Sequence, residues 1–229
     1  MKPRVIFLAA LALLSACHRP AVIDRAARLH CQAVEGVQSL LARPRGDMIL
    51  LDGDSAAGAA SQAIGCWAAA RGERVLWGAT QAAAARLIEP VRLLGARGAA
   101  VDIFRFEAAP AGDRKDAGDA RNAAFARSVA TAQARRADRL ILVVDPPDAA
   151  RAPVGLSGET WRPLGARLAP RQTISLRAEH SMRPGIRIRL MSFEDVPVRG
   201  AALRYDGIVE VGPQAQQSTA LRPSGAHGR

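Results

Sequence analysis

One short stretch of the chain combines a buried-strand pattern with side chains that could do chemistry. The apolar run Met48–Leu51 leads into the turn residues Asp52 to Ser55, and small residues follow. This pattern predicts a strand, a tight turn at Gly53, and an alanine-rich helix from about 56 to 71. A serine at such a turn is exposed at the carboxyl end of a strand, where open α/β sheets place their ligands. The following helix offers N–H groups to an oxyanion, so Ser55 is a candidate nucleophile.

The sequence around this serine resembles a known catalytic turn. Gly53-Asp54-Ser55-Ala56-Ala57-Gly58 is similar to the G-x-S-x-G nucleophile elbow of α/β-hydrolases, and most closely to that of hormone-sensitive-lipase-like esterases. The resemblance covers about 35 residues. Ala57 stands where the second glycine is usual, and the strands and backbone oxyanion motif that precede the serine in the family are missing. The resemblance implies a serine nucleophile, with one oxyanion donor in the N–H of Ala56.

The same resemblance implies two partners for the serine. The family's chain order is serine, acid, histidine, and this chain supplies Ser55, Asp145 after the apolar run Leu140–Val144, and His180. His180 would remove the Ser55 proton, while Asp145 would hold the imidazole tautomer and stabilise its positive form. The remaining histidines are less suitable, because His18 adjoins a candidate lipidation site, His30 falls on a predicted helix and His227 is in the tail.

Two further enzyme families share part of this stretch. Gly53-Asp54-Ser55 resembles the opening block of GDS(L), or SGNH, hydrolases, but the later blocks are missing, since Arg177 stands three residues before His180 where Asp-x-x-His is expected. Ile49 to Asp54 resembles the strand-D-x-D start of haloacid-dehalogenase-type phosphatases. That resemblance implies Asp52 as nucleophile, Asp54 as acid/base and Mg²⁺ between carboxylates, with these residues in the family's order: Thr80, Lys115, Asp145, Asp148.

A non-catalytic interpretation stays open beside the enzymes. In it, Asp52 and Asp54 are turn and cap residues and Ser55 is a helix N-cap. The chain would then be an envelope scaffold or would bind a partner. Arginines of the C-terminal strands would form a solvated face or an anionic docking patch, and the tryptophans would be packing residues: Arg177, Arg183, Arg187, Arg189, Trp67, Trp77, Trp161.

The first residues of the chain predict export and a lipid anchor. Met1–Ala16 carries a basic start and an apolar stretch, Val5–Leu14, that is too short to span a bilayer, as in a signal peptide. The segment Leu14-Ser15-Ala16-Cys17 resembles the lipobox of bacterial lipoproteins, which implies diacylglycerol on Cys17. Because His18 follows the cysteine in place of a retaining aspartate, the resemblance favours the outer membrane, facing the periplasm.

Charge and cysteine content narrow the partners and cofactors. Removing Lys2 and Arg4 with the signal peptide lowers the formal charge from +11 to +9 (11 − 2). Nearly all of the basic residues are arginine in an alanine-rich chain, which is typical of a GC-rich genome. The basic charge therefore does not indicate a nucleic-acid partner, and we predict none. The partners that remain open are an anionic envelope surface and a protein. After lipidation of Cys17, Cys31 and Cys66 remain as a candidate disulfide. Cysteine and histidine spacings typical of metal sites are missing, so we predict no cofactor, except Mg²⁺ if the phosphatase interpretation holds.

Strand and helix patterns alternate four times up to about residue 146. This alternation predicts an α/β fold with a mostly parallel sheet flanked by helices, Rossmann-like or hydrolase-like with three layers, over 17–146. Period-two alternation at Ile186 to Leu190 predicts strands in a β-rich part over 147–212, either an extension of the sheet or a subdomain. Residues 213–229 have a disordered composition. At the start, a helix is expected from Asp24 to Leu41, before Pro44.

Overall fold

The computed structural model describes residues 21–44, 47–106, 117–135, 137–156, 159–190 and 205–213. The predicted signal peptide, Cys17 and His18, Lys115, and the tail from 214 with His227 lie outside these residues. Within the described residues, none of the helices has the length and apolar character needed to cross a bilayer.

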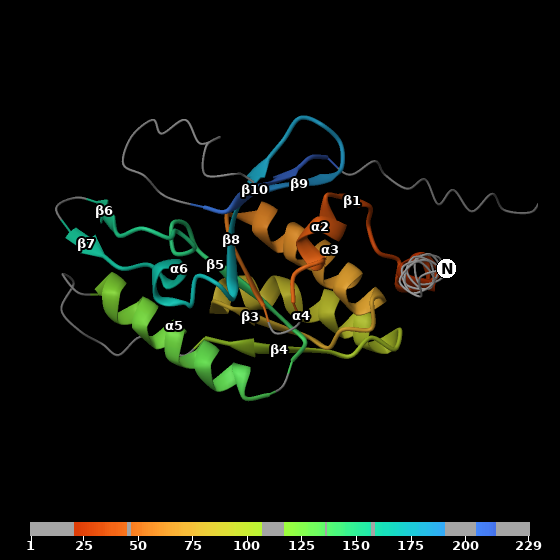
Figure 1. Ribbon diagram of the computed structural model, residues 1–229, viewed down its shortest axis with the longest axis horizontal. Helices are drawn as coiled ribbons and strands as arrows, with labels where there is room; N and C mark the ends of the chain where they lie inside the picture. Colours follow the sequence, from red (N-terminus) through yellow and green to blue (C-terminus); the bar gives the residue numbers. More distant parts are fainter. Residues whose placement is uncertain are drawn as a thin grey trace, which may run out of the picture.

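Strands and helices alternate along the chain as the hydrophobic pattern predicts (Figure 1). Residues 21–29 are helical. The elements that follow are β1 Val34–Glu35, α2 Val37–Leu41, β2 Met48–Asp52, α3 Ser55–Ala70, β3 Val75–Ala79, α4 Gln81–Ala96, β4 Val101–Arg105, α5 Ala117–Gln133, β5 Arg139–Val144, β6 Val154–Leu156, β7 Glu159–Trp161, α6 Leu164–Arg167, β8 Thr173–His180, β9 Ile186–Leu190 and β10 Gly207–Val211.

Eight strands form one mixed sheet in the order β1-β9-β10-β8-β2-β5-β3-β4. Every neighbouring pair is parallel except β9 with β10, which is antiparallel. The fold is therefore α/β with a mostly parallel sheet, as predicted. Beyond residue 146, β8, β9 and β10 continue this sheet, whereas β6 and β7 pair in a separate two-stranded sheet.

The central strands are buried along their whole length. All residues of β2, β3 and β5 are buried, which is usual for parallel strands covered on both faces. Ile49 and Leu51 of β2 belong to one hydrophobic cluster with α3 and α4, while Met48 and Leu50 belong to a second cluster with α5. Successive side chains point to opposite faces of the sheet, so α5 packs opposite α3 and α4 (Figure 1).

The prediction of one helix from Asp24 to Leu41 is wrong, because the first helical segment ends at residue 29. His30 takes a left-handed conformation, with φ of 59°, and β1 and Gly36 then separate the two helical parts. Gly36 has φ of 79°, and a Cβ there would lie 2.4 Å from the carbonyl oxygen of Ile188. Pairing with β9 therefore overrides the helical periodicity, and Ala33 lies exposed between the two helical parts.

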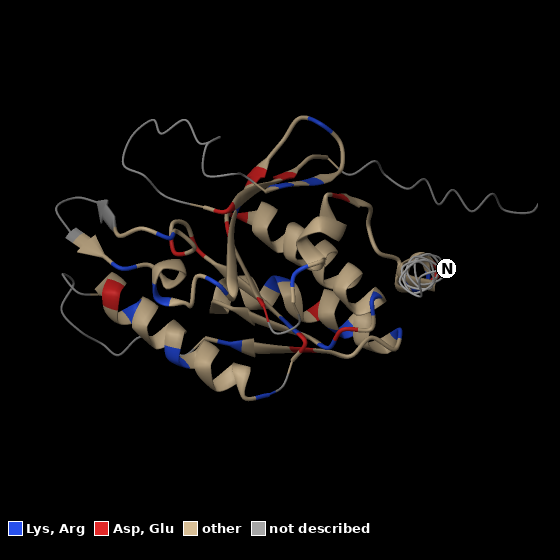
Figure 2. Ribbon diagram, viewed as in Figure 1, with Lys and Arg blue, Asp and Glu red and all other residues tan. Residues whose placement is uncertain are grey.

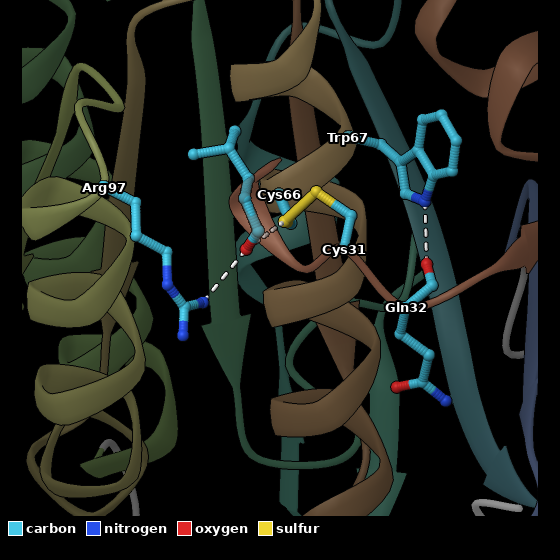
Figure 3. Close-up of a disulfide and its surroundings, with 6 residues drawn as sticks. Cys31, Gln32, Cys66, Trp67 and Arg97 are labelled. Atoms are coloured by element: carbon cyan, nitrogen blue, oxygen red, sulfur yellow. Dashed lines mark hydrogen bonds between the residues drawn. A yellow bond between two sulfur atoms is a disulfide. The ribbon is translucent and has the colours of Figure 1, made fainter. Parts of the chain in front are cut away.

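A disulfide joins the N-terminal segment to α3 (Figure 3). Cys31 and Cys66 are bonded with their Cα atoms 5.5 Å apart, which confirms the predicted pair. Next to it, the Trp67 indole Nε1 donates a hydrogen bond to the carbonyl oxygen of Gln32 over 2.7 Å. These contacts hold the break between the two helical parts against the side of α3.

The three tryptophans are packing residues to different degrees. Trp77 of β3 is fully buried and lies where a Cβ on Gly65 of α3 would be, 1.9 Å from its ring. Trp67 is partly buried against the same cluster, and Trp161 packs beside Gly118 at the start of α5. The described contacts of these rings are therefore with the protein itself.

Removing the disulfide is expected to lower the free energy of unfolding. Cross-linking residues 35 positions apart restricts the unfolded chain, and the loop-entropy relation gives about 4 kcal/mol for this separation. Denaturant unfolding of Cys31→Ser should show this loss, whereas Cys17→Ser should leave the midpoint unchanged. Rapid titration of both Cys31 and Cys66 by a thiol reagent in the native, unreduced protein would contradict the bridge.

Candidate active site

Ser55 and His180 meet at the carboxyl end of two neighbouring parallel strands. The Ser55 Oγ and the His180 Nε2 lie 3.1 Å apart, within hydrogen-bonding distance, although 125 residues separate them in the chain. Both side chains are exposed. The structure therefore brings together two of the three residues predicted for a catalytic triad.

The strand register explains this meeting. β2 and β8 pair in parallel with Asp52 opposite Arg177. Ser55 lies three residues beyond Asp52, and His180 lies three residues beyond Arg177. Both side chains therefore leave the sheet at the same level, over the end of β2, where α3 begins.

Gly53 provides the tight turn between β2 and α3. Its φ is 141°, and a Cβ at this position would lie 2.5 Å from the carbonyl oxygen of Ala178 in β8. A side chain here would collide with the neighbouring strand, so the turn requires glycine. The turn places Asp54 at the N-cap and Ser55 as the first residue of α3.

The start of α3 leaves backbone donors beside the serine. The first N–H groups of a helix have no partner within the helix, and the Asp54 side chain makes no capping hydrogen bond. These groups, with the positive end of the helix dipole, can face an oxyanion close to the Ser55 Oγ.

The backbone of Ser55 differs from the strained elbow that the α/β-hydrolase resemblance implies. Among the described residues other than glycine, His30 alone has a positive φ. Ser55 is thus an ordinary first-turn helical residue, and the positive φ at this turn belongs to Gly53. The match to the elbow is one of residue types and of position after a strand.

Asp145 does not reach His180. It follows β5, which lies on the opposite side of β2 from β8, so two strand spacings of about 10 Å in total separate the two strands. The register adds about 7 Å along the strands, because Asp145 is one residue past the level of Asp52 and His180 is three residues past it. Asp145 instead lines a cleft of about 60 Å³ together with Asp54 and Arg86.

No carboxylate among the described residues forms a hydrogen bond or ion pair with His180. The nearest acid in sequence, Glu179, pairs with Arg177 at 2.8 Å and lies on the other face of β8. The site is therefore a serine–histidine pair in the described part of the chain, and the acid of the predicted triad is not brought to it.

Asp52, the nucleophile of the phosphatase interpretation, points into the fold. It is 1% exposed, and its Oδ2 accepts hydrogen bonds from the Tyr205 hydroxyl at 2.7 Å and from the Ala149 N–H at 3.3 Å. Its Oδ1 is buried without a partner. Burial raises the pKa of Asp52 to about 6, although both hydrogen bonds and the charge of Arg177 act in the opposite direction.

The other residues of the phosphatase order do not gather around Asp52 as ligands. The Asp148 carboxylate is buried and accepts hydrogen bonds from Arg121 at 2.7 Å and from Asn122 at 2.9 Å. The Thr80 hydroxyl accepts a hydrogen bond from the N–H of Ala83 at the start of α4. No group of three or more His, Cys, Asp or Glu side chains that could hold a metal ion occurs among the described residues.

Sequence reasoning missed the partners of Asp52. Tyr205, the single tyrosine of the chain, lies two residues before β10 and 153 residues from Asp52. A lone tyrosine beside a strand is a weak signal, because its hydroxyl needs a partner only once the fold has buried it. Burial and the negative charge of Asp52 raise the pKa of Tyr205, so its hydroxyl stays protonated and donates.

The arginines of the C-terminal strands are mostly paired. Arg187 lies 3.0 Å from Glu35, and Arg189 lies close to Glu210. Arg177 pairs with Glu179 at 2.8 Å. Of the four predicted patch residues, Arg183 alone has no ion pair among the described residues, so this face has little free positive charge.

Comparison of the chain with models of protein families, with curated proteins and with solved structures finds no match.

Replacing Asp52 with asparagine should remove a pH dependence of stability. The pKa of Asp52 rises on folding from 3.8 to about 6, so its contribution favours folding below about pH 3.8 and is lost as the pH rises to about 6. The unfolding free energy of Asp52→Asn minus that of the wild type should therefore increase by about 3 kcal/mol between pH 3.5 and pH 7. Denaturant unfolding across this range tests it.

The matched control for this experiment is Asp54→Asn, which changes an exposed carboxylate two residues away. An equal increase in Asp54→Asn would show that the pH dependence does not come from the burial of Asp52. A flat difference for Asp52→Asn would show that folding does not raise the pKa of Asp52.

Proposed function

We propose that the chain is an envelope lipoprotein anchored through Cys17, with a serine hydrolase site that cleaves esters or related acyl substrates. The observation that carries the catalytic proposal is the 3.1 Å contact between the Ser55 Oγ and the His180 Nε2. A nucleophile within hydrogen-bond reach of a base, at the start of a helix, is the arrangement that acyl transfer needs.

In the proposed reaction, the Ser55 Oγ attacks the carbonyl carbon of the ester while the His180 Nε2 takes the hydroxyl proton. The backbone N–H groups at the start of α3 stabilise the developing oxyanion. The carbon–oxygen bond to the leaving group breaks, and the leaving alcohol receives the proton from His180. Water then attacks the acyl-serine, again losing a proton to His180, and the carboxylic acid leaves as Ser55 regains its proton.

Asp145 has no part in this mechanism, because it lies on the far side of β2. An imidazole without an acid partner is held less firmly in the productive tautomer, so we expect slower catalysis than a complete triad supports. Because Ser55 and His180 are exposed, the substrate would be reached from solvent.

The catalytic proposal is tested by labelling with a fluorophosphonate probe. The full chain should be labelled, Ser55→Ala should abolish the labelling, and His180→Gln should slow it about 100-fold or more, the range typical of a general base. Ser181→Ala is the matched control, because this serine adjoins His180 without belonging to the pair, and its labelling rate should be unchanged.

Asp145→Asn separates a pair from a triad in the same assay. We expect its labelling rate to stay within about threefold of the wild type, and a loss of about 100-fold would show that Asp145 moves to His180. Labelling that persists in Ser55→Ala would end the hydrolase proposal. If the folded chain takes up no label, the hydrolase proposal is rejected, and the interpretation as a non-catalytic lipoprotein remains.

The anchor is tested separately by acyl labelling in a bacterial host. The chain contains three cysteines, and the disulfide occupies Cys31 and Cys66, so Cys17 is the remaining thiol. We expect the protein to incorporate an alkyne-tagged palmitate, and Cys17→Ser to lose this incorporation. Incorporation that survives in Cys17→Ser would contradict the anchor.

A further inference from the structure

A basic groove lies at the amino ends of the parallel strands, whereas the Ser55–His180 pair lies at their carboxyl ends. It has a volume of about 270 Å³ and is bounded by the helical segment 21–29, the end of α3 and the end of α4. Three arginines line it: Arg25, Arg28 and Arg97. Its remaining walls immediately precede β3 and β4, so the groove lies at the amino ends of the parallel strands.

The positive charge of this groove is not neutralised by the described residues around it. Glu73, the acid that lines the groove, pairs with Arg139 at 2.9 Å and with Arg71 at 3.2 Å. Arg25, Arg28 and Arg97 form no ion pair among the described residues. Asp24, on the same helical segment, is exposed and likewise has no described ion pair. The groove therefore differs from the C-terminal strands, where arginines are mostly paired.

One wall of the groove is held in place by the disulfide region. The Arg97 Nη1 donates a hydrogen bond to the carbonyl oxygen of Leu29 over 3.0 Å, next to the bridge between Cys31 and Cys66 (Figure 3). Several basic segments lie on the side of the fold where the described chain begins (Figure 2). The arginines of the groove are thus positioned relative to one another by a covalent link and a backbone contact.

The helical segment that bears Arg25 and Arg28 also exposes an apolar side chain. Ile23 is 59% exposed, which is unusual for isoleucine. Ile23 lies on a different side of this helix from Arg25 and Arg28 and does not line the groove. The choice between a free phosphate ion and a lipid headgroup therefore depends on the anchor.

The groove is also close in the chain to the proposed anchor. Four residue steps separate Cys17 from Ala21, where the described helix begins, and a fully extended chain spans at most about 14 Å over that distance. A chain lipidated at Cys17 therefore keeps this helix within reach of the lipid headgroups.

We propose that the groove formed by Arg25, Arg28 and Arg97 docks on the phosphate headgroups of anionic lipids in the membrane that holds the anchor. This inference rests on the anchoring part of the proposed function, and it is independent of catalysis. The groove lies at the amino ends of the strands and Ser55 at the carboxyl ends, about 17 Å apart along a five-residue strand. Docking therefore directs the serine–histidine pair away from the membrane.

The test uses the full chain carrying Cys17→Ser, in neutral-detergent micelles, so that no covalent lipid contributes. Isothermal titration compares micelles containing phosphatidylglycerol, micelles containing phosphatidylcholine, and inorganic phosphate. We expect binding to phosphatidylglycerol that is much tighter than to either of the others. Each arginine near an anionic surface contributes about fivefold, so Arg25→Gln/Arg28→Gln/Arg97→Gln should lose about 100-fold.

The matched control makes the same charge change on the other side of the fold: Arg183→Gln/Arg187→Gln/Arg189→Gln should stay within about threefold of the parent chain. An equal loss in this control would overturn the inference, because binding would then follow net charge alone. Equally tight binding of inorganic phosphate, with full competition, would also overturn it, since the occupant would then be a free anion.

Two further measurements keep the outcome interpretable. Arg97 contacts Leu29, so if the triple variant unfolds, the single variant Arg28→Gln, at an exposed site, should still lose about fivefold. Fluorophosphonate labelling of the triple variant should equal that of the parent chain. If the parent chain is labelled at Ser55 but does not bind phosphatidylglycerol micelles, the groove alone is rejected. If the parent chain binds these micelles but is not labelled at Ser55, the hydrolase alone is rejected.

Discussion

The parallel pairing of β2 with β8 is the contact on which the candidate site depends. The two strands are paired from Met48 and Thr173 to Asp52 and Arg177, and β8 then extends three residues beyond the end of β2, to His180. The pairing brings His180 over the start of α3, and it leaves so little room beside Ala178 that residue 53 must be glycine. A shift of one residue would turn His180 to the other face of the sheet and separate it from Ser55.

The same sheet order explains which acids stay away from the pair. β5 lies on the other side of β2, so Asp145 is directed to a cleft with Asp54 and Arg86. Asp52 points to the face covered by α5 and accepts a hydrogen bond from the Tyr205 hydroxyl. Two carboxylates within three residues of Ser55 thus have different roles: one is buried and weakly acidic, and the other is exposed at the rim.

Charge is distributed unevenly over the two ends of the strands. At the carboxyl ends, the arginines of β8 and β9 have glutamate partners on β8, β1 and β10. At the amino ends, Glu73 is already paired, and the arginines beside the N-terminal helix remain free of described acids. The disulfide and the Arg97 contact hold that helix to α3 and α4, so the link predicted from two cysteines also shapes the basic groove.

The sequence by itself determined the alternation of strands and helices and the burial of Met48–Leu51, and it made Cys31 and Cys66 candidate partners. These features depend on local periodicity and on the scarcity of cysteines, both of which can be read along the chain. The break at His30 and Gly36, the distance of Asp145 from His180 and the contact of Tyr205 with Asp52 were decided by the tertiary structure. Each depends on which strands become neighbours, and that order follows from packing between residues more than 90 positions apart, for which local sequence carries no signal.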